Sequence, residues 1–174
     1  VSADPHFFDH ADLIVSAVPS RFLRQVLTDL SDRLRKGRPM ISATKGLEVP
    51  GRLRASQIIL EVAGPRPTAV ISGPSHAEEV AARMPTAVVA ASEDPGLALR
   101  VQDLFTTERF RVYTSDDLVG VEFGGALKNV LSIAGGLVDG LGFGDNTKAA
   151  LLTRGQAEMS RLGVALGGRP ETFS

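Results

Sequence analysis

The sequence predicts an α/β protein: the later part of a doubly wound parallel sheet, followed by the start of an all-helical domain. Short apolar runs rich in β-branched residues alternate five times with amphipathic segments, and only a few residues connect one to the next. Beyond Thr114 the alternation stops and only helical patterns follow. We therefore predict two partial domains, residues 1–115 and 116–174.

Composition narrows the classes of function. The 174 residues leave room for one to two domains, and the formal charge of −1 argues against nucleic acid or an anionic membrane as the main partner. Cysteine is absent, which excludes disulfides and thiolate catalysis and is compatible with a reducing cytoplasm. The sequence has no signal-peptide pattern and no run of about 20 apolar residues, so we expect no integral membrane segment.

The predicted strands are short, apolar and bounded by turn residues, which is typical of buried strands. They cover residues 12–18, 39–43, 68–72, 86–91 and 110–114. The helices predicted between them cover residues 20–34, 56–62, 76–82 and 95–105. We expect Ser20 to cap the first of these helices and Lys36-Gly37 to end it, while Pro95 begins the last one.

Residues 1–10 predict one helical turn before the first strand. His6 and His10 lie four residues apart with Asp9 between them, and a helix would bring the two imidazoles together. Because the sequence places no third ligand nearby, we expect no metal site there.

The longest predicted helix, residues 116–138, has an apolar stripe that indicates burial. Its apolar residues recur at steps of three and four: Val121, Leu127, Val130, Leu131 and Ala134. Each interior glycine costs about 1 kcal/mol relative to alanine, so glycines here need a packing or ligand reason. A second helix, residues 146–162, follows a glycine-rich joint at 140–144, with Asn146 expected as its N-cap.

Lys128 stands in the middle of this apolar run, which favours a function over a solvated surface position. A helical side chain leans over the residues three and four positions earlier, here Gly125 and Gly124, so the amine projects over bare backbone with room for a small molecule. Asn129 adds a polar neighbour, and Glu122 falls on about the same face as Asn129.

Three loops follow predicted strands, and ligands of open α/β sheets gather outside the carboxyl ends of the strands. The loops are Pro19-Ser20, Thr44-Lys45-Gly46 and Gly73-Pro74-Ser75. Gly73 and Ser75 open a helix whose free N–H groups suit a phosphate, with Ser75 as a simple N-cap as the alternative. Lys45 belongs either to this site or to a solvated loop. We predict that Lys45, Ser75 and Lys128 converge on one cleft between the sheet and the helical segment.

Two common fingerprints are absent from the sequence. G-x-G-x-x-G does not occur, and Gly140, Gly142 and Gly144 follow a helix instead of a strand, so they do not count as a dinucleotide motif. Serine-hydrolase chemistry is poorly supported, because Ser75 and His76 are sequence neighbours and G-x-S-x-G is absent.

Taken together, these segments resemble the bacterial type of NAD(P)-dependent glycerol-3-phosphate dehydrogenase. The matching stretches are AVPSRFLRQVL, ISATKGLE, ISGPSHAEEVA followed by PTAVVAAS, and EFGGALKNVLSIAGGLVDGLGFGDNTKAALLTRGQAEMSRLG. The ALKN and TRG-x-x-EM blocks are specific, whereas VPS and TKG are shared with related dehydrogenases. The resemblance implies a Rossmann-like dinucleotide-binding domain, a helical substrate domain, and NAD or NADP as cofactor. It further implies hydride transfer between the nicotinamide and C2 of sn-glycerol 3-phosphate, giving dihydroxyacetone phosphate, for cytoplasmic glycerophospholipid synthesis.

The resemblance also implies roles for the residues that match its motifs. Lys128 would be the catalytic proton acceptor and would touch a small phosphate substrate, with Asn129 beside it. Lys45 would lie next to both substrate and cofactor, and Gly73 and Ser75 would bind the substrate.

For the dinucleotide, the resemblance assigns Phe22, Ala77 and Lys45 to the cofactor site, and it leaves a homodimer open. Oxidising a secondary alcohol needs a base for the hydroxyl proton while the hydride leaves. A lysine can serve once burial and a neighbouring cation lower its pKa. We expect Lys128 to experience both influences, because Lys45 is predicted nearby.

The sequence departs from the family pattern at both ends. At its start it lacks the first strand and the glycine loop that hold the pyrophosphate in the family. At its end it stops before the region where the family keeps an aspartate and an arginine–asparagine pair for substrate and cofactor. We therefore expect these 174 residues to be a fragment that is inactive alone.

Two other interpretations stay open. One is a different dehydrogenase with the same two-domain plan, of the 6-phosphogluconate or 3-hydroxyacid type, whose helix carries different polar residues where this one has Leu-Lys-Asn. The other is a non-catalytic dimerisation or binding module, with which the charged residues Arg154, Glu158 and Arg161 are consistent. Such a module would not need Lys45 and Lys128. The sequence leaves NAD and NADP undistinguished.

Overall fold

The computed structural model describes residues 5–34 and 37–173. Five strands form a sheet in the order β1-β2-β3-β4-β5. The strands are β1 (Ile14–Ser16), β2 (Met40–Ser42), β3 (Thr68–Ser72), β4 (Thr86–Ser92) and β5 (Phe110–Ser115). Each lies within a residue or two of a strand predicted from the sequence, and helices alternate with them as expected.

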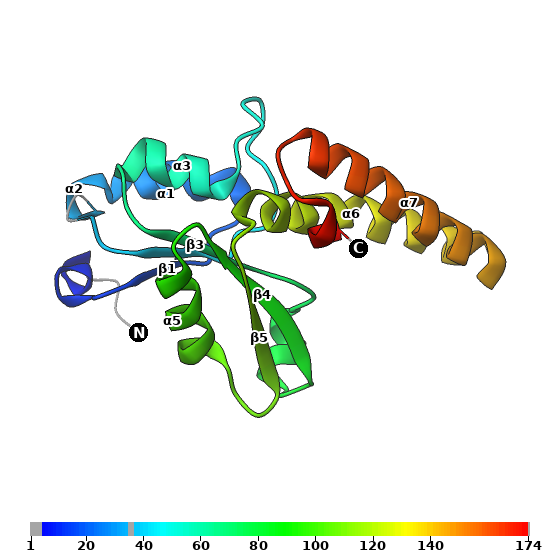
Figure 1. The fold of residues 1–174 in the computed structure, drawn as a ribbon, viewed down its shortest axis with the longest axis horizontal. Coiled ribbons are helices and arrows are strands. Elements are labelled where there is room, and N and C mark those ends of the chain that lie inside the picture. The colour runs from blue at the N-terminus through cyan, green and yellow to red at the C-terminus, as the bar shows by residue number, and fades with distance from the viewer. Residues whose placement is uncertain (1–4, 35–36, 174) are drawn as a thin grey trace.

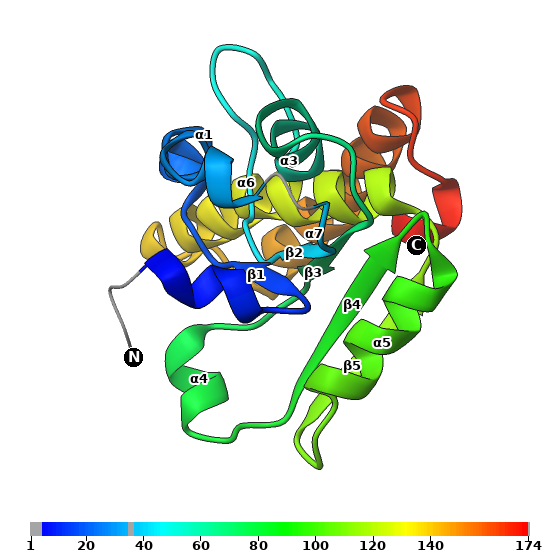
Figure 2. The ribbon, with the colours of Figure 1, turned by 90° about the vertical axis from the view of Figure 1, so that its left-hand side faces the viewer.

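The sheet is mixed, so the prediction of a parallel sheet is wrong for one pair of strands. β1, β2 and β3 run parallel, as do β4 and β5, but β3 pairs antiparallel with β4, Ala69 lying opposite Ser92. A parallel neighbour requires a crossover that packs on a face of the sheet. The connection here contains the five-residue helix α4 (Ala77–Ala81), whose residues are all exposed or partly exposed. Figure 2 shows α4 beside the sheet and away from its faces, so the chain re-enters at the same edge in the opposite direction.

Helices cover both faces of the sheet (Figure 1). Because side chains alternate along a strand, Met40 packs with α1 (Ser20–Asp29) and α3 (Ala55–Ala63) on one face, while Ile41 packs with α5 (Pro95–Phe105) on the other. This arrangement is the doubly wound plan expected from the sequence.

The long helix α6 (Leu118–Gly140) follows β5 and packs on the face opposite to α5. Its first turns contribute Leu118 and Val121, which are buried against Val70 of β3 and Ala91 of β4. The helix α7 (Asp145–Ala165) then runs back along α6, and the predicted joint separates the two. A close approach between them depends on Gly155, since a Cβ there would collide with the side chain of Leu131.

Burial of α6 changes halfway along its length. Its buried residues all lie in the first half: Leu118, Gly120, Val121, Glu122, Phe123 and Gly125. In the second half, Val130, Ile133 and Leu137 have 61–68% of their surface exposed. The prediction of a buried helix is therefore wrong for the second half, because periodicity identifies an apolar face but not whether a neighbour covers it.

The ends of several helices differ from the sequence prediction. Pro19 occupies the N-cap position of α1, so Ser20 lies inside the first turn, and Gly144 takes the same position for α7, which places Asn146 inside that helix. The predicted helix 20–34 is divided into α1 and α2 (Ser31–Leu34), and Lys36 lies outside the described residues. Short 3-10 helices occur at Pro5–His10 (η1) and Pro170–Phe173 (η2).

By length and composition alone, α6 could cross a membrane, and it is the one helix among the described residues with this property. Core helices satisfy the same criterion. Because the first half of α6 packs on β3 and β4 and carries the buried, ion-paired Glu122, and because α7 packs along α6, we interpret it as a helix of the folded protein. On α7, Arg154 and Glu158 form an ion pair, with 2.9 Å between Arg154 Nη2 and Glu158 Oε1.

Candidate active site

The loops that follow β1 and β2 lie directly against each other at one edge of the sheet. Ala43 N–H donates to the carbonyl of Ser16 (2.8 Å), and the hydroxyl of Thr44 donates to the carbonyl of Val18 (2.7 Å). Gly46 has a φ of +111°, and a Cβ added there would lie 3.2 Å from Ser20 Oγ. The Thr44-Lys45-Gly46 loop is thereby held on Pro19-Ser20.

Lys45 joins this pair of loops to the third. Its Nζ donates to the carbonyl oxygen of Gly73 (2.8 Å) and to Ser75 Oγ (2.9 Å). The side chain of Lys45 is partly buried, so the alternative of a solvated loop lysine does not describe it. Gly73 is required because β4 passes close by: its φ is +151°, and an added Cβ would lie 2.9 Å from Val88 Cα.

Lys128 approaches the same place from α6. Burial, and then the positive charge of Lys128, lower the pKa of Lys45. The sequence led us to expect that burial and a neighbouring cation act on Lys128, whereas the structure shows both acting on Lys45. Lys128 itself is partly exposed.

Gly125 brings α6 to this edge of the sheet. A Cβ at this position would collide with Ser72 Oγ, at the end of β3, so the glycine permits close packing of the helix on the strand. Ser72 therefore covers the bare backbone of Gly125, while room for a small molecule beside the Lys128 ammonium stays a prediction. A Cβ on Gly124 would be in ordinary contact, 3.8 Å from the ring of Phe173.

The helix after the third loop is short. His76 occupies the N-cap position of α4, and the Ser75 hydroxyl is engaged by Lys45, so the alternative of Ser75 as an N-cap is wrong. Ala77 is the first residue of α4 and is exposed.

Two further residues singled out in the sequence lie at the surface. Phe22 is in the first turn of α1, its surface is 48% exposed, and the guanidinium carbon of Arg21 lies 4.5 Å from its ring centroid. Asn129 follows Lys128 on α6 and is also exposed.

Sequence reasoning missed a buried ionic contact behind the site. Arg54 Nη1 lies 2.5 Å from Glu122 Oε2, and the same carboxylate accepts from the backbone N–H of Ser56 (2.9 Å) and from its hydroxyl (2.5 Å). Glu122 was expected on the face of Asn129, but its side chain is only 6% exposed. A glutamate within an apolar helix stretch is a signal that could have been followed, because such a charge needs a buried partner.

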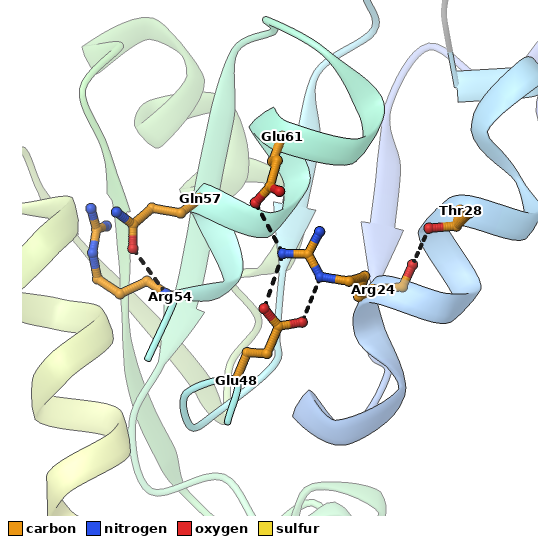
Figure 3. A network of polar contacts seen from close by, with 6 residues as sticks. All are labelled: Arg24, Thr28, Glu48, Arg54, Gln57 and Glu61. Atoms are coloured by element: carbon orange, nitrogen blue, oxygen red, sulfur yellow. Dashed lines mark hydrogen bonds and ion pairs between the residues drawn. The ribbon is translucent and has the colours of Figure 1, made fainter. Parts of the chain in front are cut away.

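Arg24 of α1 joins Glu48, three residues after Lys45, to α1 and α3 (Figure 3). Its guanidinium binds both carboxylate oxygens of Glu48, at 2.7 and 3.0 Å, and reaches Glu61 of α3 at 2.9 Å. The hydrogen bond from Arg24 is the main cause that lowers the pKa of Glu48.

Within residues 5–34 and 37–173, no group of three or more histidine, aspartate or glutamate side chains could hold a metal ion. His6 instead lies beside Asp9 (3.4 Å from Nδ1 to Oδ2), and Arg33 contacts the same carboxylate at 3.3 Å.

The molecule is thus an α/β protein with a doubly wound sheet, whose strand-end loops hold the partly buried Lys45 at the end of the sheet where ligands of this class of fold bind. Comparison with known proteins specifies the family. The model for the N-terminus of NAD-dependent glycerol-3-phosphate dehydrogenase matches residues 5–98, and the model for its C-terminus matches residues 117–174. The chain belongs to the NAD-dependent glycerol-3-phosphate dehydrogenase family.

Individual relatives agree with this assignment. A glycerol-3-phosphate dehydrogenase (NAD(P)+) from Geobacter sulfurreducens is 53% identical over 94% of this chain and 50% of its own length, and one from Clostridium tetani is 51% identical over 92% and 46%. The crystal structure of glycerol-3-phosphate dehydrogenase from Coxiella burnetii superposes with a TM-score of 0.90 and 40% identity, over 97% of this chain and 51% of that one. The chain spans about half the length of the curated relatives it matches.

Proposed function

We propose that this chain supplies part of the active site of an NAD(P)-dependent glycerol-3-phosphate dehydrogenase acting in glycerophospholipid synthesis. The reaction would convert sn-glycerol 3-phosphate to dihydroxyacetone phosphate. The observation that carries the proposal is the hydrogen bond between Lys45 and Ser75 at the carboxyl ends of β2 and β3, with Lys128 three residues after the point where α6 packs on Ser72, in a chain of this family. A non-catalytic module would gain nothing from two adjacent ammonium groups, which repel each other.

In this proposal Lys128 accepts the hydroxyl proton of the substrate. The C–H bond at C2 breaks with its electron pair, the O–H proton passes to the amine, and a C=O bond forms. NAD(P) supplies the acceptor for the hydride. A lysine can accept the proton only when its amine is neutral.

Substrate recognition would rest on Lys45, Gly73, Ser75 and Asn129. Lys45, which donates to the Ser75 hydroxyl, and Lys128, whose charge acts on Lys45, offer positive charge and donors to a phosphate group. α4 has five residues, so we expect side-chain charge, more than the end of this helix, to hold the phosphate.

The residues proposed to contact the cofactor suit a planar, charged ligand. Phe22 presents an aromatic ring that is half exposed at the loop edge, Ala77 is exposed without bulk, and Lys45 supplies a partly buried cation. An exposed ring of this kind can stack on a flat group. Nothing in these contacts favours NAD over NADP.

We further propose that residues 1–115 and 116–174 are parts of two domains, supported by the change to helices after β5 and by the separate matches of the two family models. A cytoplasmic location and a homodimer belong to the same proposal. The exposed apolar residues Val130, Ile133 and Leu137 support the homodimer, because apolar patches of this kind mark interaction surfaces. Light scattering on the purified protein tests the homodimer.

The function is tested on the full-length protein that contains these residues. We expect it to oxidise NADH or NADPH when dihydroxyacetone phosphate is added. The matched controls replace this ketone with 6-phosphogluconate plus NADP+, or with a 3-hydroxyacid plus NAD+. Turnover with either control but not with dihydroxyacetone phosphate would move the protein to one of the other dehydrogenase classes, and no turnover with any of them would favour a binding module.

A further inference from the structure

The segment that carries Lys45, residues 43–54, is fastened to its surroundings at three points. At its start, Thr44 binds the carbonyl of Val18. In its middle, Glu48 binds Arg24 through two hydrogen bonds. At its end, Arg54 forms the ion pair with Glu122 of α6. The third attachment differs from the others, because its partner is the helix that also carries Lys128.

The carboxylate of Glu122 is fully engaged in this contact. Oε1 accepts from the N–H of Ser56, in the first turn of α3, and Oε2 accepts from the Ser56 hydroxyl and from Arg54. A carboxylate at a helix N-terminus satisfies N–H groups that lack partners within the helix, and the positive end of the helix dipole favours its charge. Glu122 thus serves α3 as a capping group that belongs to another helix.

The contact links Lys45, proposed to bind substrate, and Lys128, the proposed proton acceptor, through short stretches of the chain. Arg54 is the last residue before α3 and lies nine residues after Lys45. Glu122 lies six residues before Lys128 in the same helix, which is about 9 Å along its axis. Lys45 is held by Gly73 and Ser75, and α6 packs on β3 through Val121 and Gly125, so the Glu122 contact adds a polar attachment that sets how α6 lies against the start of α3.

We propose that Glu122 is a positioning residue: by binding Arg54 and Ser56, it fixes the helix that carries Lys128 against the segment that carries Lys45. The kinetic part of this proposal rests on the proposed function, whereas the geometric part does not. If Glu122 is neutralised, α6 loses its attachment to the start of α3, and the two amines are no longer held at one separation.

Glu122→Gln in the full-length protein tests the proposal, with the pKa of Lys45 as the primary measurement. The pKa is obtained from the pH dependence of acetylation of Lys45, followed by mass spectrometry. Lys128→Met serves as the reference, because it removes the second cation and must raise the pKa of Lys45. Glu158→Gln is the matched control, since Glu158 also pairs with arginine but on the exposed surface of α7. We expect Glu122→Gln to raise the pKa of Lys45 in the direction seen for Lys128→Met, and Glu158→Gln to leave it unchanged.

A second variant covers the case in which Glu122→Gln fails to fold because Arg54 is left as a buried, unpaired charge. Arg54→Gln/Glu122→Gln removes both charges and is expected to fold and to show the same rise. In both variants kcat should fall at least ~10-fold while the KM of the dinucleotide changes little, as expected when reacting groups are misplaced. An unchanged Lys45 pKa in a folded variant, with only a lower melting temperature, would overturn the proposal. The pKa of Lys45 is measured without any enzymatic turnover. A failure of the proposed dehydrogenase function can therefore be distinguished from a failure of the proposed positioning role of Glu122.

Discussion

The Nζ of Lys45 lies 2.9 Å from the hydroxyl oxygen of Ser75, and this hydrogen bond joins the loops that follow β2 and β3. The two residues are thirty positions apart in the sequence. Their contact gives the edge of the sheet a partly buried ammonium group close to a second one, that of Lys128, and burial and charge together lower the pKa of Lys45.

This lowered pKa should make part of the stability of the protein depend on pH. In the range between the lowered pKa and the ordinary value of 10.5, the unfolded chain binds a proton at Lys45 that the folded protein has released. The free energy of unfolding of the native sequence, relative to Lys45→Met, should therefore increase as pH rises through this range. Urea unfolding at a series of pH values measures the difference.

Lys148→Met is the control for this measurement, with the opposite sign. The hydrogen bond to Asp139 raises the pKa of Lys148, so its contribution is present below 10.5 and is lost as pH rises through the raised value. A relative stability that stays level with pH at Lys45, or falls as at Lys148, would contradict the burial of Lys45.

Gly73→Ala should destabilise the protein by about 1–3 kcal/mol, the usual scale for forcing extra atoms into a packed site. The new Cβ would lie 2.9 Å from Val88 Cα and 3.0 Å from the carbonyl of Ala87, both in the backbone of β4. Gly135→Ala is the matched control: a Cβ there meets no described atom within 4 Å, and alanine should stabilise α6 by up to about 1 kcal/mol. Denaturant unfolding of both variants checks this, and equal effects would refute the close approach of β4.

Asp117→Ala should cost more than the loss of an ordinary helix cap. Asp117 accepts from the N–H of Gly120 (2.8 Å) at the start of α6, and also from the N–H of Arg169 (2.8 Å) and the hydroxyl of Thr172 (2.6 Å). We expect a loss of about 2–4 kcal/mol, whereas Asp94→Ala, which removes the cap of α5, should cost about 1 kcal/mol.

The same residue predicts an acid dependence. Burial raises the pKa of Asp117, but these hydrogen bonds outweigh it and hold the pKa below 3.8. Its stabilisation should therefore be complete above pH 3.8 and decrease as pH falls through the lowered pKa. Equal losses of unfolding free energy for Asp117→Ala and Asp94→Ala at neutral pH would contradict the role of Asp117 in connecting η2 to α6.

Much of the site could be predicted from the sequence, because the strand-end rule depends on local patterns. The apolar runs before Lys45 and Gly73 identified the strands, and parallel strands β2 and β3 bring their loops to one edge. The direction of β4 was missed although a signal existed. The segment of residues 73–85 carries Glu78 and Glu79 and lacks an apolar stripe, so it could not pack on a face of the sheet as a crossover.

Other features depend on contacts that no local pattern contains. Glu122 and Arg54 lie 68 residues apart, and neither position reveals its partner. The exposed second half of α6 has the same periodicity as the buried first half, so the sequence could not distinguish them. A packing or ligand role was expected for the glycines of this helix, and for Gly125 the structure shows a packing role, because α6 lies directly against Ser72 there.

The role of Lys128 is the central claim, and two substitutions in the full-length protein separate a base from a structural cation. Lys128→Met keeps the length and apolar packing of the side chain but removes the amine. Lys128→Arg keeps the positive charge, but a guanidinium cannot accept the hydroxyl proton.

The most direct measurement is the kcat of Lys128→Arg, taken together with its melting temperature. We predict that kcat falls at least ~10²-fold, the scale of lost general acid–base catalysis, in both Lys128→Arg and Lys128→Met, while the melting temperature stays close to that of the native protein. Near-normal turnover of Lys128→Arg would show that charge alone is needed at this position and would contradict the assignment of Lys128 as the proton acceptor.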